Sequence, residues 1–177
     1  MAQLIVQKLC PRSPVQRLNI NGEDVKIAAI VDRIETIARI LNNRHYPICV
    51  LFDRERRAKT CDQIYVEVEC ELASRGLNPE QFRVGICDRT IENWILADRS
   101  LLLNAYNFTG SAAFEGTQGK PTLKRICERV EQYRETTVGV RLFTSANPQV
   151  MYDNSPSFQR FVSRIDFQCS WSERIER

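Results

Sequence analysis

The fold expected for this chain is decided by the stretch Ile48-Cys49-Val50-Leu51-Phe52-Asp53-Arg54-Glu55-Arg56-Arg57. Its first five residues are apolar, which is typical of a short buried strand, and two acids and three arginines follow directly. In an open α/β sheet, ligands bind in the crevice outside the carboxyl ends of the strands. Asp53 and Glu55 are therefore candidate ligands of a hard cation such as Mg²⁺, and the arginines beside them suit an anionic substrate.

Length and composition bound the class of protein. The chain has 177 residues, the size of a single domain, and a compact chain of this length buries roughly 70% of its unfolded surface without needing a disulfide. Its seven cysteines are scattered without a Cys-x-x-Cys pair, and His45 is the only histidine. This composition argues against a zinc site of the usual spacing and against a His-based triad. Free cysteines, and the lack of an apolar run near the roughly 18 residues of a membrane span, lead us to expect a cytoplasmic protein that makes no membrane contact.

The hydrophobic period alternates between strand and helix. Apolar residues from Ile27 to Leu41 recur at three- and four-residue spacing, which predicts an amphipathic helix. Thr60 and Gln63 have the spacing of a capping box, which predicts a helix that runs to Ser74 and stops at Gly76. The other expected elements are a helix at 1–9, strands at 15–20, 48–52 and 82–87, a helix at 88–103, and helices beginning at Lys120-Pro121 and Ser155-Pro156.

Strands that alternate with helices predict an α/β fold with a mostly parallel sheet. We expect one domain over 1–177, in which residues 104–177 form a helical excursion and a C-terminal extension. The helix that begins at Lys120-Pro121 is expected to carry its apolar residues on one side, namely Leu123, Ile126, Cys127 and Val130.

A second acidic group follows the second of the two clearest strands. Glu92 lies beside an apolar helix face, in a segment that must come near the end of the Asp53 strand if the two strands are adjacent and parallel. We therefore expect Asp53, Glu55 and Glu92 to surround one Mg²⁺ ion. Asp88 has two interpretations: it is a fourth metal ligand, or it is the N-cap of the following helix.

Basic residues cluster beside the first acidic group, although the 25 basic and 22 acidic residues of the whole chain nearly cancel, to a net charge of +3. Arg54, Arg56, Arg57 and Lys59 place four cations within six residues. They form either a solvated loop or a loop that contacts phosphate. Further along, Gly116 to Thr122 is interpreted as a loop that leads into a helix, from which Lys120 can reach a substrate phosphate.

These motifs together resemble a known family. Asp53-Arg54-Glu55 at a strand end, followed by Ile91-Glu92-Asn93-Trp94, resembles the Toprim domain, especially that of the OLD (overcoming lysogenization defect) and abortive-infection type. Three downstream motifs are similar to an uncharacterised Toprim-like family found with ATPases in bacterial phage-defence loci: Gly119-Lys120, Tyr133 and Ser155-Pro156-Ser157-Phe158. The resemblance extends from about Leu4 to Ile165.

The resemblance implies a Toprim-like (Rossmann-like) sheet that binds Mg²⁺ through Asp53, Glu55 and Glu92 and cuts or rejoins nucleic-acid phosphodiesters, here in anti-phage defence. Toprim domains begin with a strand that ends in a catalytic Glu, which has no match here. The domain is therefore expected to be N-terminally incomplete, or to have lost a catalytic group. The alternative function is a degenerate accessory subunit that binds an ATPase partner or nucleic acid. Other doubly wound folds also place an Asp at a strand end. Only the motif at Glu92 distinguishes a Toprim domain from them in this sequence.

Overall fold

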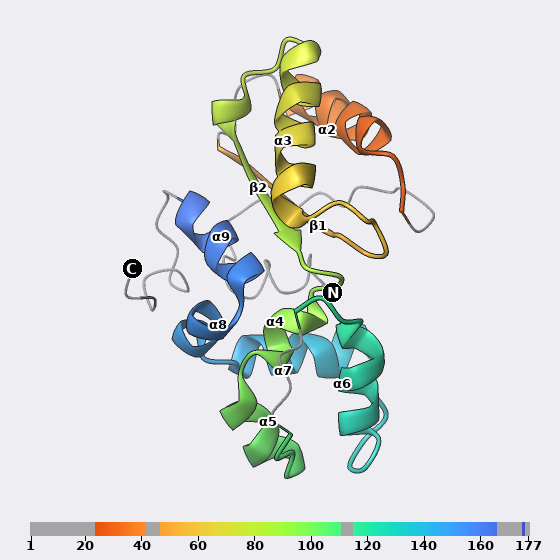
Figure 1. The fold of residues 1–177 in the computed structure, drawn as a ribbon, viewed down its shortest axis with the longest axis vertical. Helices are drawn as coiled ribbons and strands as arrows, with labels where there is room; N and C mark the ends of the chain where they lie inside the picture. Colours follow the sequence, from red (N-terminus) through yellow and green to blue (C-terminus); the bar gives the residue numbers. More distant parts are fainter. Residues whose placement is uncertain (1–23, 42–46, 111–114, 166–174, 176–177) are drawn as a thin grey trace.

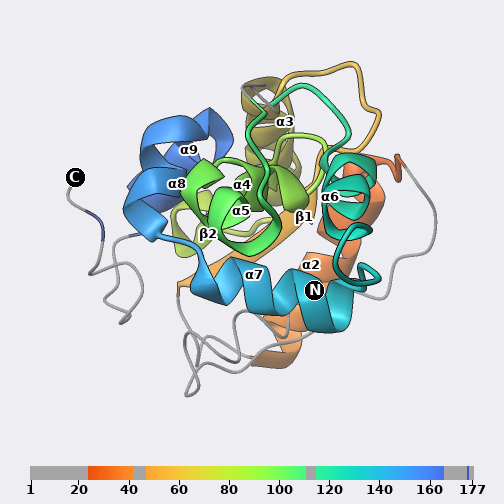
Figure 2. The ribbon, with the colours of Figure 1, turned by 90° about the horizontal axis from the view of Figure 1, so that it is seen from below.

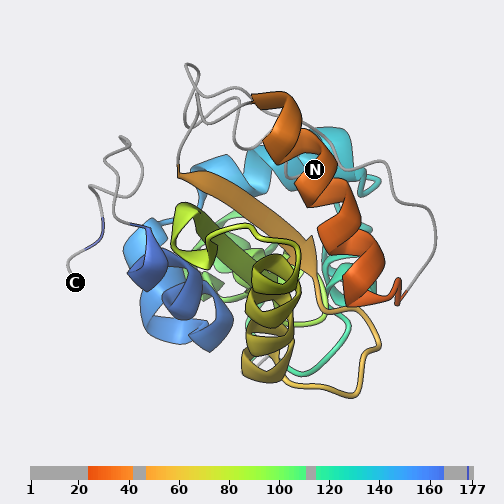
Figure 3. The same cartoon turned by 90° about the horizontal axis from the view of Figure 1, so that it is seen from above.

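The computed structural model of the chain describes residues 24–41, 47–110, 115–165 and 175. Within them, β1 (Ile48–Asp53) and β2 (Phe82–Cys87) form a parallel two-stranded sheet. In the register of this pair, Val50 lies opposite Val84 and Asp53 lies opposite Cys87. The strands lie between α2 (Ile27–Leu41) and α9 (Pro156–Arg164) when the molecule is viewed from above (Figure 3). The predicted α/β class and parallel strand pairing are confirmed.

One face of the sheet carries a core formed with α2 and α3 (Cys61–Ser74). Helix α2 buries the stripe that its spacing predicts, including Ile27, Val31 and Ile34. At the start of α3, the Gln63 amide donates to Thr60 Oγ1 at 3.2 Å and Gln63 Oε1 accepts from the Thr60 amide at 2.9 Å, so the predicted capping box is present. Beyond the helix, Gly76 adopts a φ of +72°, a left-handed conformation that glycine reaches without strain.

A second core joins the other face of the sheet to the helical part of the chain. This part contains α4 (Glu92–Leu96), α5 (Arg99–Tyr106), α6 (Gly119–Cys127), a π-helical turn at Glu135–Gly139, α7 (Val140–Ser145), α8 (Pro148–Asn154) and α9. Trp94 of α4 is 1% exposed and packs edge-on against Phe158 and stacked on Phe161 of α9. Figures 1 and 2 show α4 between the sheet and α5, whereas α9 lies alongside β2. The end of β2 is therefore held by contacts from both cores.

The structure corrects several local predictions. The single helix expected at 88–103 is two helices, because Asp98 accepts hydrogen bonds from the amides of Leu101 and Asn147 and caps α5 in the middle of that range. Helix α4 begins at Glu92, so Asp88 precedes the helix and is not its N-cap. Helix α6 ends at Cys127, which leaves Val130 66% exposed instead of buried. The π-helical turn, α7 and α8 lie in a segment for which the hydrophobic pattern predicts no particular element.

Some predictions fall outside the described residues. These are the helix at 1–9, the strand at 15–20 and any role of His45. No helix in the described part of the chain has the length and apolar character needed to cross a membrane.

Candidate functional site

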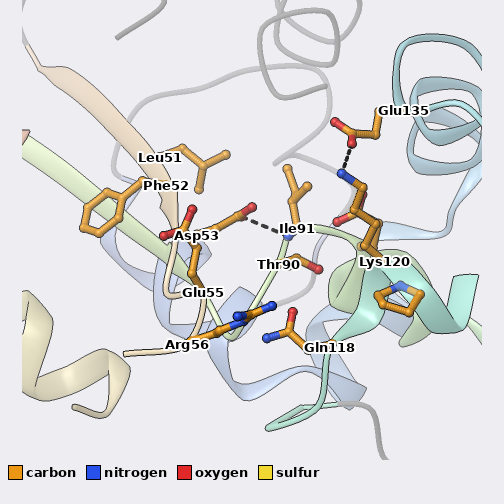
Figure 4. Close-up of a pocket in the computed structure, with 12 residues that line it drawn as sticks. Leu51, Phe52, Asp53, Glu55, Arg56, Thr90, Ile91, Gln118, Lys120 and Glu135 are labelled. Atoms are coloured by element: carbon orange, nitrogen blue, oxygen red, sulfur yellow. Dashed lines mark hydrogen bonds and ion pairs between the residues drawn. The ribbon is translucent and has the colours of Figure 1, made fainter. Parts of the chain in front are cut away.

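A pocket of about 480 Å³ opens at the carboxyl ends of β1 and β2. Three predicted acids, Asp53, Glu55 and Glu92, line it, and so do Arg56 and Lys120 from the predicted basic set. Figure 4 shows Asp53 and Glu55 beside the end of β1, with Arg56 next to Gln118 on one side and Lys120 with Glu135 on another. The position agrees with the general rule for ligand sites in open α/β sheets.

Asp53 is the last residue of β1 and is half-buried. One carboxylate oxygen accepts the Ile91 amide at 3.0 Å (Figure 4). Burial raises the pKa of Asp53 to about 7, and the negative charge of Glu92 contributes further to the increase. The Ile91 amide opposes the shift without cancelling it. Asp53 is therefore a carboxylate whose negative charge is poorly compensated by the chain itself, and a bound cation would stabilise that charge.

Glu92 is the first residue of α4 and is 2% exposed. The Tyr133 hydroxyl donates to Glu92 Oε1 at 3.0 Å. Burial, followed by the charge of Glu92 and the hydrogen bond to it, raises the pKa of Tyr133 far above its usual value. The hydroxyl consequently stays protonated and remains a donor to the carboxylate.

Glu55 lies in the loop after β1 with a φ of 55°. Its amide donates to the carbonyl oxygen of Arg89 at 2.8 Å, and Arg89 itself has a φ of 63°. The left-handed region is sparsely populated by residues other than glycine, so two such residues in facing loops store backbone strain next to the pocket. The Arg89 guanidinium ties these loops together, since it donates to the carbonyl oxygens of Glu55 at 3.0 Å and Gly116 at 3.2 Å.

Asp88 is placed apart from the other three acids and does not line the pocket. Its carboxylate forms an ion pair with Arg54 Nη2 at 2.6 Å and accepts a hydrogen bond from the Gly116 amide. Both side chains of the pair are nearly buried, at 10% and 11% exposure. In this structure Asp88 fastens the loop before α6, and it neither caps a helix nor joins the other acids.

The predicted basic residues divide into two groups. Arg54 is buried, and Arg57 donates to the carbonyl oxygens of Val25 at 2.6 Å and of Asp53 at 3.1 Å, so both serve loop structure. Lys59 pairs with Glu67 at 2.9 Å outside the pocket. Of the predicted basic residues, Arg56 and Lys120 are the two that line the pocket.

The acids of the pocket can be compared with the set of ligands that Mg²⁺ prefers in proteins. Within residues 24–41, 47–110 and 115–165, no three His, Cys, Asp or Glu side chains gather closely enough to hold a metal ion by themselves. Asp53 and Glu92 both line the pocket, and, after burial, the charge of Glu92 raises the pKa of Asp53 more than that of Glu55 does. Mg²⁺ in phosphate-handling sites is commonly held by one or two carboxylates together with water and substrate phosphate. The donor set therefore fits Mg²⁺ that is completed by a phosphate ligand.

Two further residues of the site are not predicted as such from the sequence. Tyr133 enters only as part of the family resemblance, and Glu135, which pairs with Lys120, has no pattern that marks it. The hydrogen bond to Tyr133 joins residues 41 positions apart. Spacing rules act over one or two helical turns, so no local signal was present to find it.

These features define an α/β protein with an acidic pocket at the carboxyl ends of two parallel strands. The family described as Domain of unknown function (DUF4276) matches residues 3–166, and the chain belongs to that family. No curated protein and no solved structure matches the chain.

Proposed function

We propose that this protein is a Mg²⁺-dependent nuclease or phosphodiesterase of Toprim-like type that acts on nucleic acid in anti-phage defence. The observation that supports this proposal best is the pocket that Asp53 and Glu92 line together at the carboxyl ends of the two strands. Burial, and after it the negative charge of Glu92, raises the pKa of Asp53 to about 7. Arg56 and Lys120 border the same pocket. Carboxylates beside cations suit a metal ion and a phosphate bound together.

Each residue has a distinct role in this proposal. Bound Mg²⁺ supplies charge stabilisation at the phosphoryl oxygens and lowers the pKa of water. Asp53 and Glu92 would hold the cation, and Glu55 lines the same pocket from the loop after β1. Arg56, beside Gln118, and Lys120, beside Glu135, would bind and orient the phosphate (Figure 4).

Cleavage assays with Mg²⁺, Mn²⁺ or EDTA test this function on plasmid DNA, linear DNA and RNA. We expect metal-dependent cleavage that Glu92→Gln reduces by at least roughly 100-fold, because the removal of an outer partner of a metal ligand already costs roughly 10- to 100-fold and Glu92 is proposed as a ligand itself. The matched control is Glu128→Gln, an exposed glutamate after α6 that does not line the pocket. Equal cleavage by the wild-type chain and Glu92→Gln contradicts the proposal.

The ion pair between Lys120 and Glu135 leads to a second prediction. Glu135 raises the pKa of Lys120 and competes with any phosphate for its ammonium group. We expect Glu135→Gln to tighten the binding of a short single-stranded oligonucleotide about two- to five-fold in EDTA, as measured by fluorescence anisotropy. The effect should shrink at high salt.

Glu128→Gln is also the control for this measurement. It releases Lys124, another lysine of α6, from a similar exposed pair outside the pocket. An equal gain in both variants means that the added net positive charge, and not the pocket, attracts the oligonucleotide.

The second candidate function is a non-catalytic subunit that binds an ATPase partner or nucleic acid. The observation that favours it, in the form that binds an ATPase, is that Arg54, Lys59 and Lys120 are paired within the chain, which reduces the positive charge available to nucleic-acid phosphates. This function predicts no metal-dependent cleavage, together with a stable complex with an ATPase encoded by a neighbouring gene. Co-purification followed by size-exclusion chromatography measures that complex.

A further inference from the structure

Tyr133 combines two features that a residue of the core alone does not need. Its ring belongs to the core of the helical part and is 8% exposed. Its hydroxyl, which is also buried, donates to Glu92 Oε1 at 3.0 Å. The ring accounts for the burial of the residue, whereas the hydroxyl acts on an acid of the pocket.

The hydrogen bond from Tyr133 restricts the side-chain conformation of Glu92. A glutamate side chain has several rotatable bonds, and fixing them costs conformational entropy. Glu92 stands at the first position of α4, which has only five residues. A carboxylate has about four lone-pair sites, so one hydrogen bond at Oε1 fixes its direction and leaves capacity for a cation on both oxygens.

The segment that carries Tyr133 serves the pocket a second time. Two residues later, Glu135 begins a π-helical turn and pairs with Lys120 at the pocket. Single π-helical turns are rare in proteins as a whole, and many of those that occur lie at functional sites. One short segment thus contacts two side chains of the same pocket: Tyr133 binds the Glu92 carboxylate, and Glu135 pairs with the Lys120 ammonium group.

We propose that Tyr133 is a positioning residue of this site: its hydroxyl holds the Glu92 carboxylate in the direction in which it shares a divalent cation with Asp53. This role rests on the proposed metal-dependent function. It makes the helical part of the chain a functional component of a site whose other acids come from the loop and strand of the α/β part.

The test measures Mn²⁺ affinity of the full chain by electron paramagnetic resonance, without any activity assay. Tyr133→Phe keeps the ring and removes only the hydroxyl. We expect it to weaken Mn²⁺ binding about tenfold, the loss typical when an outer partner of a metal ligand is removed. Thermal unfolding followed by circular dichroism checks that the fold is retained.

Tyr106→Phe is a closely matched control. Tyr106 is 5% exposed, and its hydroxyl donates to a glutamate, Glu131, at 2.6 Å outside the pocket. It loses the same kind of hydrogen bond, so a purely structural effect would appear in both variants. We expect Tyr106→Phe to bind Mn²⁺ as the wild type does.

A double variant measures the coupling directly. If Tyr133 acts through Glu92, Tyr133→Phe should cause no further loss of Mn²⁺ affinity in the Glu92→Gln background. Wild-type affinity in Tyr133→Phe, beside a loss in Glu92→Gln, overturns the role of Tyr133 and leaves the metal site in place. Absence of Mn²⁺ binding by the wild-type chain overturns both.

Discussion

Replacing Asp53 with Asn is expected to abolish metal-dependent cleavage and to stabilise the fold at neutral and alkaline pH. Asn keeps an oxygen that accepts the Ile91 amide, now at 3.0 Å, so the local backbone is retained. It removes the negative charge that burial and Glu92 disfavour. The same charge is the one that a cation needs, so function is lost as stability is gained.

The pH dependence of this gain has a fixed sign. Asp53 titrates near 3.8 when exposed and at about 7 in the fold. Between these values the folded chain binds the proton that the unfolded chain has lost, so the contribution of Asp53 to stability is full below about pH 4 and falls as pH rises through 7. The advantage of Asp53→Asn should therefore be absent near pH 4 and complete above pH 7, at about 2 kcal/mol after allowance for the solvent at the pocket.

Urea unfolding of both chains at pH 4.5 and pH 8 measures this difference. Asp62→Asn is the control, because Asp62 is an exposed acid at the start of α3 and pairs with Arg160 at 3.1 Å. Saturating Mg²⁺ should stabilise the wild type and leave Asp53→Asn unchanged. If Asp53→Asn is less stable than the wild type at pH 8, the claim that the charge of Asp53 destabilises the fold is wrong. If Asp53→Asn cleaves normally, the claim that Asp53 is needed for cleavage is wrong.

Predictions from the sequence succeeded where the determining contacts are local. The capping box at Thr60 and the apolar stripe from Ile27 depend on residues within a turn or two, and both are present. The grouping of Asp53 with Glu92 in one pocket also follows from sequence, because adjacent parallel strands end at the same edge. Their identification as metal ligands stays a prediction.

Predictions failed where the partner is distant in the chain. The pattern at Asp88 is compatible with an N-cap, and only the fold brings it to Arg54, 34 positions earlier, and to the Gly116 amide. Asp98 likewise interrupts a helical pattern because it also binds the Asn147 amide. In each case the segment has a helical pattern, but its polar side chain accepts a hydrogen bond from a backbone amide in a distant loop. The hydrophobic period carries no information about such a partner.

The ion pair between Arg54 and Asp88 leads to a second prediction with a large expected effect, on the stability of the fold. We expect Arg54→Met to lower the free energy of unfolding by about 3–5 kcal/mol, because a buried carboxylate is left without its counter-ion. Urea unfolding measures the loss. Lys59→Met is the control: Lys59 is 58% exposed and pairs with Glu67 in solvent, where loss of a pair changes stability by less than about 1 kcal/mol.

A double variant separates the ion pair from the rest of the environment of Asp88. Asp88→Asn keeps an acceptor for the Gly116 amide but removes the charge. In the Arg54→Met background it should therefore restore part of the lost stability, although Asp88→Asn alone is destabilising because it leaves Arg54 unpaired. If Arg54→Met is instead as stable as the wild type and binds oligonucleotides more weakly, Arg54 is a phosphate contact, as the basic cluster first suggested, and its burial against Asp88 is not its principal role.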